Sequence, residues 1–533
     1  MNWIISLALR YNYYITYFHL FLIIFLFFIN LKDLTRFTKA YNPKKIWIIV
    51  FLIILAFGTS LRLSTSLTEF GVGKNIQQSI TGYYLYKYHI WNRCERGSLD
   101  SCIMPDSPQY PIGHSFFMNL LYTFFGFPLA AQGYYFSLII SSMSIVLIFL
   151  FSALLFKDVR IGLISGCLFS IFPVHILMTA SKETALFNIF FIVLSQIFLI
   201  LLFHIQTKRF FLLSLSLIIW SFLFRPNSII TVSLISIFYL FINRKKLKIN
   251  KISSDCDISS KILFLILVFL FVFNIITAEF IGSVHLNNKF TDDSNNFLPH
   301  LNYFIRFLFE SRKFIFLFLA FAAIFINKRN KKEIGYLVFW YFVSVMSFLV
   351  YPGDPNRIPQ RYIVVSYIPL FLLAAAGINK VTKKLSKKSL TRYFFVSFII
   401  LFLVTYISGT LDEVKFLKRN YNRQREILKI RKEISPAFKI ITTEGEAMRE
   451  LMLFGENVDS LELMEISDNV RSFKIIVEQD EETYYLEEKE ICRKENDKIG
   501  DLIVRPLCKR FLDSNSLKKI YDKEHFIVYK VTN

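Results

Sequence analysis

Carboxylates that could take a proton from a hydroxyl stand at two places where an apolar stretch meets a polar one. Glu69 follows the apolar run Ile46–Leu63, and Glu183 stands directly before the run that begins at Thr184. Such a carboxylate can act as general base, and two together can bind a divalent cation; the sequence indicates no certain cofactor and leaves this choice open. Both acids also have a non-catalytic interpretation. Glu69 could simply be an exposed carboxylate at the interface, and Glu183 could be an acid in the first turn of a helix that Ser181 caps. Three more acids compete with Glu69 in its loop: Glu95, Asp100 and Asp106.

Cationic and aromatic side chains near the same boundaries could hold a substrate. The guanidinium group is a planar fork that matches phosphate oxygens, so arginines at the membrane surface predict a bound phosphate. The segment Tyr110 to His114 is typical of a turn that enters an interfacial helix. Anchoring of span ends at the interface explains these residues equally well. The candidate substrate contacts are Arg62, Tyr110, His114, Lys182, Arg225, Arg357, Arg361 and Tyr362.

The apolar blocks that must position these residues predict an α-helical polytopic membrane protein. Of 533 residues, 54% are hydrophobic and 17% aromatic, which exceeds the usual content of soluble domains. We expect about 11–13 transmembrane helices, since most blocks reach the length that crosses a hydrocarbon core. The two spans that flank Arg225-Pro226-Asn227 also fit one interrupted hairpin. The expected spans are Tyr14–Asn30, Ile46–Leu63, Gly133–Phe156, Ile161–Met178, Thr184–His204, Phe210–Phe224, Ser228–Ile242, Ile262–Ile281, Phe314–Ile326, Ile334–Val350, Tyr362–Ile378 and Phe394–Ile407.

The net charge of +22 indicates membrane topology rather than nucleic-acid binding. Lysine and arginine cluster in connectors that alternate with the other loops, which is the pattern that orients helices in a bilayer. All of these connectors can face the cytoplasm, which leaves the loops with Glu69, Glu183 and Arg225 outside. The N-terminus then also lies outside, and we expect the first span to be peripheral to the working core. The basic connectors are Lys32–Lys45, Lys157–Arg160, Lys208–Arg209, Arg244–Lys261, Lys328–Lys332 and Lys380–Arg392.

The cysteines agree with this topology. Cys167 falls in a span and Cys256 in a basic connector, where unpaired thiols are expected. The other four fall on the expected outer face, where disulfides form; free thiols placed by chance are the alternative, and the pairing cannot be derived. Two of them share the first outer loop and two share the C-terminal part: Cys94 with Cys102, and Cys492 with Cys508.

The chain divides into three parts by composition. Residues 1–45 hold the first span and its connector, and residues 46–409 hold the other spans, with a first outer loop at 64–132. Residues 410–533 have the composition of a soluble domain, and their alternating patterns predict a small α/β domain outside the cytoplasm. This part contains no Gly-rich phosphate loop. Its apolar or strand-like segments are Phe438–Thr442, Val458–Met464, Phe473–Glu478, the region near Ile520, and Phe526–Val531.

Residues between Ile46 and Lys380 resemble the GT-C glycosyltransferases of the protein O-mannosyltransferase and lipid A aminoarabinose transferase type. The resemblance lies in the order and spacing of short motifs rather than in any one of them. The motifs are Arg62 before an acid-bearing loop, Tyr110-Pro111-Ile112-Gly113 before a helix that ends in Phe125-Gly126, Lys182-Glu183-Thr184, Leu223-Phe224-Arg225-Pro226-Asn227, and Arg361 to Leu370 closed by Ala374 to Gly377.

The resemblance implies a polyprenyl-phosphate-linked sugar as donor and a hydroxyl acceptor at the outer face of a bacterial cytoplasmic membrane. Lipid A, a surface polysaccharide and a protein are all open as acceptors. By similarity Glu69 would be the general base and Glu183 the acid of the second loop, with Arg225 and Arg361 as phosphate contacts. The C-terminal part would correspond to the extracytoplasmic domain of that family.

Two other functions fit the same features. A lipid-linked oligosaccharide flippase or other transporter would carry charges near the membrane midplane and paired interrupted helices, whereas the informative charges here gather at one face. An O-antigen ligase or polymerase would be favoured by a long outer loop late in the chain, and the loop from Tyr351 to Arg361 is short.

Overall fold

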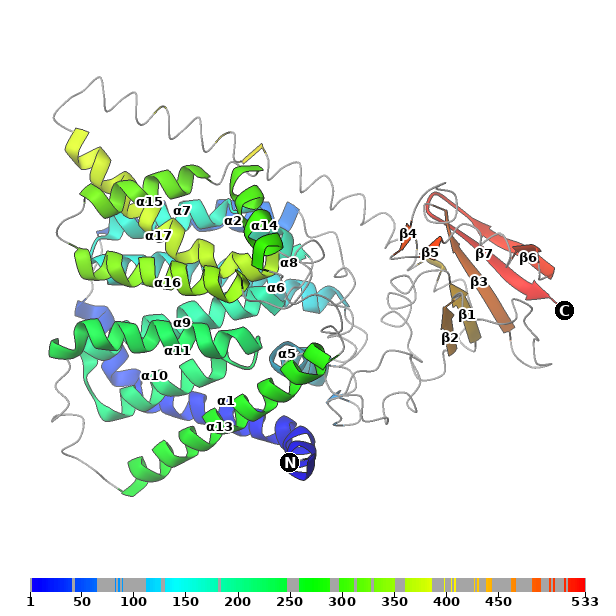
Figure 1. The fold of residues 1–533 in the computed structure, drawn as a ribbon, viewed down its shortest axis with the longest axis horizontal. Coiled ribbons are helices and arrows are strands. Elements are labelled where there is room, and N and C mark those ends of the chain that lie inside the picture. The colour runs from blue at the N-terminus through cyan, green and yellow to red at the C-terminus, as the bar shows by residue number, and fades with distance from the viewer. Residues whose placement is uncertain are drawn as a thin grey trace.

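The helices of the protein form one bundle, and a small β-sheet lies beyond the end of the bundle where α5 is found (Figure 1). The computed structural model describes residues 2–40, 44–64, 82, 85–86, 89, 112–125, 130–180, 184–246, 258–287, 297–310, 314–326, 330–349, 360–385, 397, 404, 407–408, 426, 429–430, 438–442, 462–465, 482–489, 498–499, 502–503, 512–513 and 516–532. The helices are α1 (Asn2–Ala40), α2 (Lys45–Ser64), α5 (Ile112–Phe125), α6 (Ala130–Phe156), α7 (Val159–Ser170), α8 (Pro173–Ala180), α9 (Thr184–Ile205), α10 (Lys208–Ser221), α11 (Pro226–Asn243), α13 (Ile258–Asn287), α14 (Phe297–Glu310), α15 (Phe314–Ile326), α16 (Lys331–Leu349) and α17 (Gln360–Leu385).

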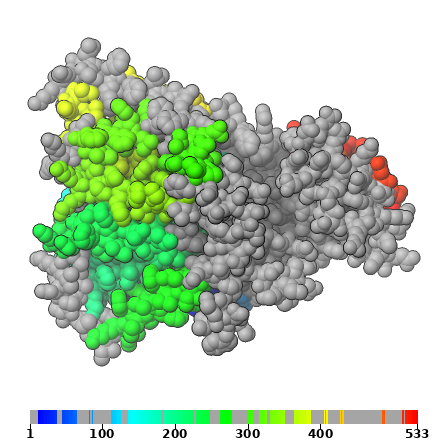
Figure 2. Space-filling model, viewed as in Figure 1, coloured from blue at the N-terminus to red at the C-terminus, as the bar shows by residue number. Residues whose placement is uncertain are grey.

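The chain is a multi-pass membrane protein. Within the described residues, seven helices are long and apolar enough to cross a bilayer, or up to eight if a bent pair counts as one span. Two shorter apolar segments, Lys261–Thr277 in α13 and Ile315–Phe325 in α15, accompany them. Helices α11, α13, α15 and α16 form much of the visible side of the bundle (Figure 2). Large apolar side chains are exposed there, such as Ile237 and Phe269, as expected of a surface that faces lipid. The span predicted at Phe394–Ile407 lies almost wholly outside the described residues.

Two expectations about the elements are wrong. The single span predicted at Ile161–Met178 is broken into α7 and α8, which meet at an angle of 61°. The break precedes Pro173, which has no N–H for the helical ladder and clashes with the preceding turn. The stretch between the expected spans Ile262–Ile281 and Phe314–Ile326, which those spans leave as a loop, contains the helix α14.

Helix α17 lies at the centre of the bundle. Every residue from Ile363 to Asn379 is buried, and the helix packs against α15, α16 and α7. The approach to α15 depends on Gly377, because a Cβ at this position would overlap the carbonyl oxygen of Leu319. Small residues that permit backbones to approach are typical of helix contacts in membranes.

The first helix packs onto the bundle. Helix α1 packs against α10, α13 and α5. The buried His19 ring lies 3.2 Å from both the carbonyl and the hydroxyl oxygen of Ser216 in α10. At the other contact, the amide of Asn119 in α5 donates to the Tyr17 hydroxyl over 2.9 Å. Polar pairs of this kind hold helices together where lipid offers no hydrogen bonds.

Asp158 links the α6–α7 turn to the end of α17. Its Oδ1 accepts from the backbone N–H of Arg160 (3.0 Å) and so caps α7. Its Oδ2 accepts from the Asn379 amide (3.0 Å) and the Lys383 ammonium (2.7 Å). Burial raises the pKa of this carboxyl, but the hydrogen bonds, chiefly that from Lys383, lower it more, so that the pKa lies below its ordinary value of 3.8.

The C-terminal part contains a mixed five-stranded sheet of order β2-β1-β3-β7-β6. Strand β1 pairs in parallel with β2 and β3, whereas β3–β7 and β7–β6 are antiparallel. The carboxylate of Glu426 accepts from two backbone N–H groups at the start of β7, those of His525 (3.0 Å) and Phe526 (3.1 Å). The small C-terminal domain with a sheet is therefore confirmed. The strands are β1 (Phe438–Thr442), β2 (Glu462–Glu465), β3 (Glu482–Glu488), β4 (Lys498–Ile499), β5 (Leu502–Ile503), β6 (Ser516–Asp522) and β7 (Phe526–Thr532).

Candidate functional site

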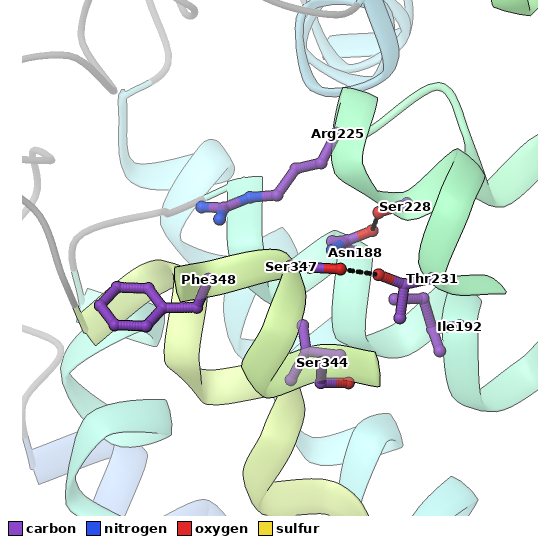
Figure 3. A pocket seen from close by; sticks show the side chains of 9 residues that line it. Asn188, Ile192, Arg225, Ser228, Thr231, Ser344, Ser347 and Phe348 are labelled. Atoms are coloured by element: carbon purple, nitrogen blue, oxygen red, sulfur yellow. Dashed lines mark hydrogen bonds between the residues drawn. The ribbon is translucent and has the colours of Figure 1, made fainter. Parts of the chain in front are cut away.

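A polar pocket lies where α9 and α11 begin and α16 ends, against the first turns of α17. Figure 3 shows Arg225 extending from the start of α11 above the pocket, toward the end of α16 that carries Phe348. The empty space at the pocket, open solvent included, amounts to about 370 Å³. It is lined by Asn188, Ile192, Arg225, Ser228, Thr231, Ser344, Ser347, Phe348 and Val365.

The polar groups of this pocket, four hydroxyls, one amide and one guanidinium, include donors that could bind an anion. Ser228 Oγ donates to Asn188 Oδ1 over 2.6 Å, which leaves the amide N–H groups of Asn188 for another acceptor. The hydroxyls of Thr231 and Ser347 share one hydrogen bond of 3.1 Å. Ser344 is 4% exposed, and its hydroxyl has no hydrogen-bond partner among the described residues. With one guanidinium and no carboxylate among the described residues that line it, the pocket suits an oxygen-rich anion such as a phosphate.

Arg225 is held in place by the local backbone. It is the N-cap residue of α11, with an extended backbone at φ −153° and ψ 137°, and Pro226 follows at the first helical position. Proline is well suited to that position, because its φ is already helical and the missing N–H has no partner there in any case. The turn that leads into Arg225 is fixed by helix α5: the N–H of Gly113 donates to the Leu223 carbonyl over 2.8 Å.

Only glycine fits at the α5 end of this contact. A Cβ on residue 113 would lie 2.6 Å from the Leu223 carbonyl oxygen and 2.9 Å from Phe224. The two sequence motifs that contain Gly113 and Arg225, separated by more than a hundred residues, are thereby joined. The next residue, His114, is fully buried, and its ring meets the Phe187 ring of α9 edge-on at 5.1 Å. It lies in the contact between α5 and α9 and is not among the pocket-lining residues.

Arg62 is engaged by the protein itself. It is completely buried, and its guanidinium makes five hydrogen bonds, as many as it has N–H groups. The acceptors are Ser141 Oγ, the carbonyls of Gly58, Phe169 and Ser170, and His175 Nδ1. This geometry indicates a structural role and leaves no donor for a substrate.

The structure describes only some of the other predicted site residues. Helix α17 begins at Gln360, so Arg361 and Tyr362 stand in its first turn, one turn before Val365 of the pocket. The Cys167 thiol is free, as expected. Several predicted residues lie outside the described ones: Glu69, Tyr110, Lys182, Glu183 and Arg357, together with Cys94, Cys102, Cys256, Cys492 and Cys508. The described residues contain no group of three or more His, Cys, Asp or Glu that could hold a metal ion, so the divalent cation stays a prediction.

Sequence reasoning found Arg225 and missed the rest of the pocket. The missed residues are one amide and four hydroxyls: Asn188, Ser228, Thr231, Ser344 and Ser347. Isolated serines and threonines occur throughout these spans, so their type carries no signal. One usable signal is spacing, since Ser228 and Thr231, like Ser344 and Ser347, are three residues apart and share a helix face.

Comparison with known proteins identifies the fold. No family model matches the sequence, and no curated protein matches it. Among solved structures, the chain is similar to the oligosaccharyltransferase of Archaeoglobus fulgidus in the apo form, with a TM-score of 0.50, 12% identity, and coverage of 84% of this chain and 70% of that chain. The same values hold for the archaeal oligosaccharyltransferase AglB from Archaeoglobus fulgidus in complex with an inhibitory peptide and a dolichol-phosphate. These neighbours are GT-C proteins, and the chain therefore has the GT-C fold.

Proposed function

We propose that this protein is an integral-membrane glycosyltransferase that moves a sugar from a polyprenyl-phosphate donor to a hydroxyl acceptor at the outer face of a bacterial cytoplasmic membrane. The observation that carries the proposal is the donor-rich pocket beneath Arg225, in a bundle with the GT-C fold. A donor anchored by its lipid brings its phosphate to the membrane interface, at the depth where span ends meet water. The structural neighbour bound to a dolichol-phosphate supports a lipid phosphate as ligand.

In this proposal the Arg225 guanidinium and the hydroxyls beneath it neutralise the leaving phosphate. Charge that develops on the leaving group is stabilised best by donors already in place. Glu69 would take the proton of the acceptor hydroxyl as general base, with Glu183 as the acid of the second loop. A single displacement inverts the sugar carbon, and an NMR assignment of the product that showed retention would exclude it. Lipid A, a surface polysaccharide or a protein is the acceptor, and a hexose or pentose the sugar.

A lipid-linked oligosaccharide flippase is the second candidate, favoured by the broken span α7–α8. Transporters of this kind carry broken helices in corresponding pairs around a midplane site. The described helices contain one bent pair, and the pocket lies at helix ends rather than at mid-span. An O-antigen ligase or polymerase would share the chemistry and differ in the acceptor.

The deciding experiment uses the purified full chain in proteoliposomes with a radiolabelled polyprenyl-phosphate sugar. A transferase releases or transfers the sugar and leaves a free polyprenyl phosphate. If the polyprenyl-phosphate sugar instead moves to the other leaflet with its sugar still attached, the result supports the flippase.

Arg225→Met is expected to raise the KM for the donor about tenfold or more, the usual weight of a hydrogen bond to a charged group. Arg225→Lys should recover part of this loss, since it keeps the charge but not the fork. Arg244→Met is the matched control, because Arg244 caps the opposite end of the same helix and lies over the Phe241 ring. Wild-type KM and kcat in Arg225→Met would remove Arg225 from the site. For the base, Glu69→Gln should abolish transfer while membrane insertion stays intact.

A further inference from the structure

The break between α7 and α8 leaves backbone carbonyls that need a partner inside the bundle. The last four carbonyls of an α-helix receive no hydrogen bond from within that helix. In the interior of a bilayer no water is available to donate one instead. In a continuous helix the Phe169 carbonyl would accept from residue 173, but Pro173 has no N–H, and this carbonyl accepts from the Phe172 N–H over 3.2 Å instead. The Ser170 carbonyl, at the very end of α7, still needs a donor from another part of the fold.

Arg62 supplies this donor. Its Nη1 donates to the Ser170 carbonyl over 2.8 Å, and its Nη2 lies 3.4 Å from the Phe169 carbonyl. A cation at this place also offsets the negative end of the α7 dipole. The side chain reaches the break from the last turn of α2, more than a hundred residues earlier in the chain.

The remaining donors of Arg62 join the other side of the break to the bundle. Nη2 donates to His175 Nδ1 of α8 over 2.8 Å, and Nε donates to the Ser141 hydroxyl of α6 over 2.6 Å. Thr179, one turn further along α8, donates to the same Ser141 hydroxyl over 2.6 Å. Since an arginine cannot accept, His175 Nδ1 must be the acceptor here and the ring carries its proton on Nε2. The bend is thus held on both sides by one buried side chain.

A glycine allows this approach. Gly58, one turn before Arg62 in α2, faces the end of α7 so closely that a Cβ would lie 2.7 Å from the Ser170 Cβ and 2.7 Å from Ile145 of α6. Its carbonyl also accepts from Arg62 Nη1 over 2.8 Å.

We propose that Arg62 is a positioning residue that replaces the missing helical donors at the α7–α8 break and so sets the direction of α8. Helix α8 ends at Ala180 and α9 begins at Thr184, so this direction determines where α9 enters the bundle, one turn before Asn188 of the pocket. The expected effect on sugar transfer rests on the proposed function, whereas the effect on the bend does not.

The test compares three variants of the full chain: Arg62→Met, Arg62→Lys and Gly58→Ala. Hydrogen–deuterium exchange should quicken about tenfold or more across residues 171–180 in both Arg62 variants, because an ammonium cannot reach five acceptors spread over four helices. Gly58→Ala keeps the charge but separates α2 from Ser170, and should quicken exchange in the same segment. Gly335→Ala is the matched control, since a Cβ there meets nothing within 4 Å.

Transfer kinetics provide the second readout. A positioning role predicts that kcat falls in Arg62→Lys as it does in Arg62→Met, with a smaller change in the KM for the donor. Wild-type exchange in Arg62→Lys would overturn the proposal, because charge alone would then suffice. A raised KM in Arg62→Met with unchanged exchange would also overturn it, in favour of a direct ligand contact. If Arg62→Met fails to fold, Arg62→Lys and Gly58→Ala decide; if the wild type shows no transfer, the proposed function fails while the exchange measurement still decides on the bend.

Discussion

Replacement of Gly113 by alanine should damage the site without touching any group that is expected to bind substrate. Gly113 joins α5 to the turn that carries Arg225, because its N–H donates a hydrogen bond of 2.8 Å to the Leu223 carbonyl. The new Cβ would lie 2.6 Å from that carbonyl oxygen, where ordinary van der Waals contact starts at 3.4 Å. The two segments must therefore separate by about 0.8 Å, the difference between these two distances.

The size of the effect follows from that displacement. A hydrogen bond of 2.8 Å lengthened by this amount is lost, which leaves a buried acceptor unpaired at a cost of about 1–3 kcal/mol. Overpacking adds a cost of about 1–3 kcal/mol, of which the higher helix propensity of alanine recovers about 0.5–1 kcal/mol. We expect a net destabilisation of about 1–5 kcal/mol from these terms. Since misplacement of a group by about 1 Å can cost roughly a hundredfold in rate, transfer should fall well beyond the loss of folded protein.

The assay measures both quantities in one preparation. Thermal unfolding in detergent gives the change in stability, and the initial rate of sugar transfer is divided by the amount of folded protein. Gly335→Ala, in α16, controls for a glycine-to-alanine change in a membrane helix and should leave both unchanged. Unaltered stability in Gly113→Ala would refute the close contact, and a normal rate per folded molecule would show that the α5 contact does not position Arg225.

Three further predictions concern stability. Asp158→Asn should lower the Tm modestly, because asparagine still caps α7 but lacks the charge that pairs with Lys383, which contributes about 0.2–1 kcal/mol. Because the folded-state pKa is depressed, this difference from wild type should be full above pH 4 and vanish as the pH falls through the lowered pKa; a difference that persists well below it would contradict the ionic link. Gly377→Ala should destabilise the bundle by more than about 2 kcal/mol by forcing α15 from α17, measured as a fall in Tm, with an unchanged Tm as the contrary result. Glu426→Ala should expose the start of β7 to hydrogen exchange while Glu426→Gln, which keeps an acceptor, exposes it less; equal protection in both would mean that the carboxylate does not hold the strand.

The sequence predicts most of the bundle because an apolar run long enough to cross a bilayer has few other uses. The runs behind α2, α9, α16 and α17 correspond closely to the expected spans. Composition fails where a helix is broken or lies along the surface. The α7–α8 run is apolar throughout, and only Pro173 signals its break. In α14 the apolar positions recur at helical spacing, but polar residues between them lower the average below that of a span.

The site is less predictable, because its residues meet only through long-range packing. Arg225 stands out in sequence as a cation at a turn between two spans. Arg62 stands out in the same way, yet its partners lie up to 113 residues away, and only their positions distinguish a structural arginine from one that binds phosphate. The hydroxyls of Ser344 and Thr231 become a site because the end of α16 and the start of α11 border one space, which no local pattern encodes.

The floor of the pocket bears on the choice between an enzyme and a transporter. Along α9, Asn188 and Ile192 line the pocket, and Gln196 follows one turn deeper. Its amide donates to Ser236 of α11 over 2.9 Å and its carbonyl accepts from the Tyr336 hydroxyl of α16 over 2.9 Å. This buried network joins α9, α11 and α16, three of the helices that line the pocket, one turn deeper than Ile192. Hydrogen bonds that tie these helices together on the inner side of the pocket suit a ligand that enters and leaves by the Arg225 side, as in a group transfer at one face of the membrane. A carrier would have to break these bonds in every cycle, at a cost of about 1 kcal/mol or more for each polar group left without a partner.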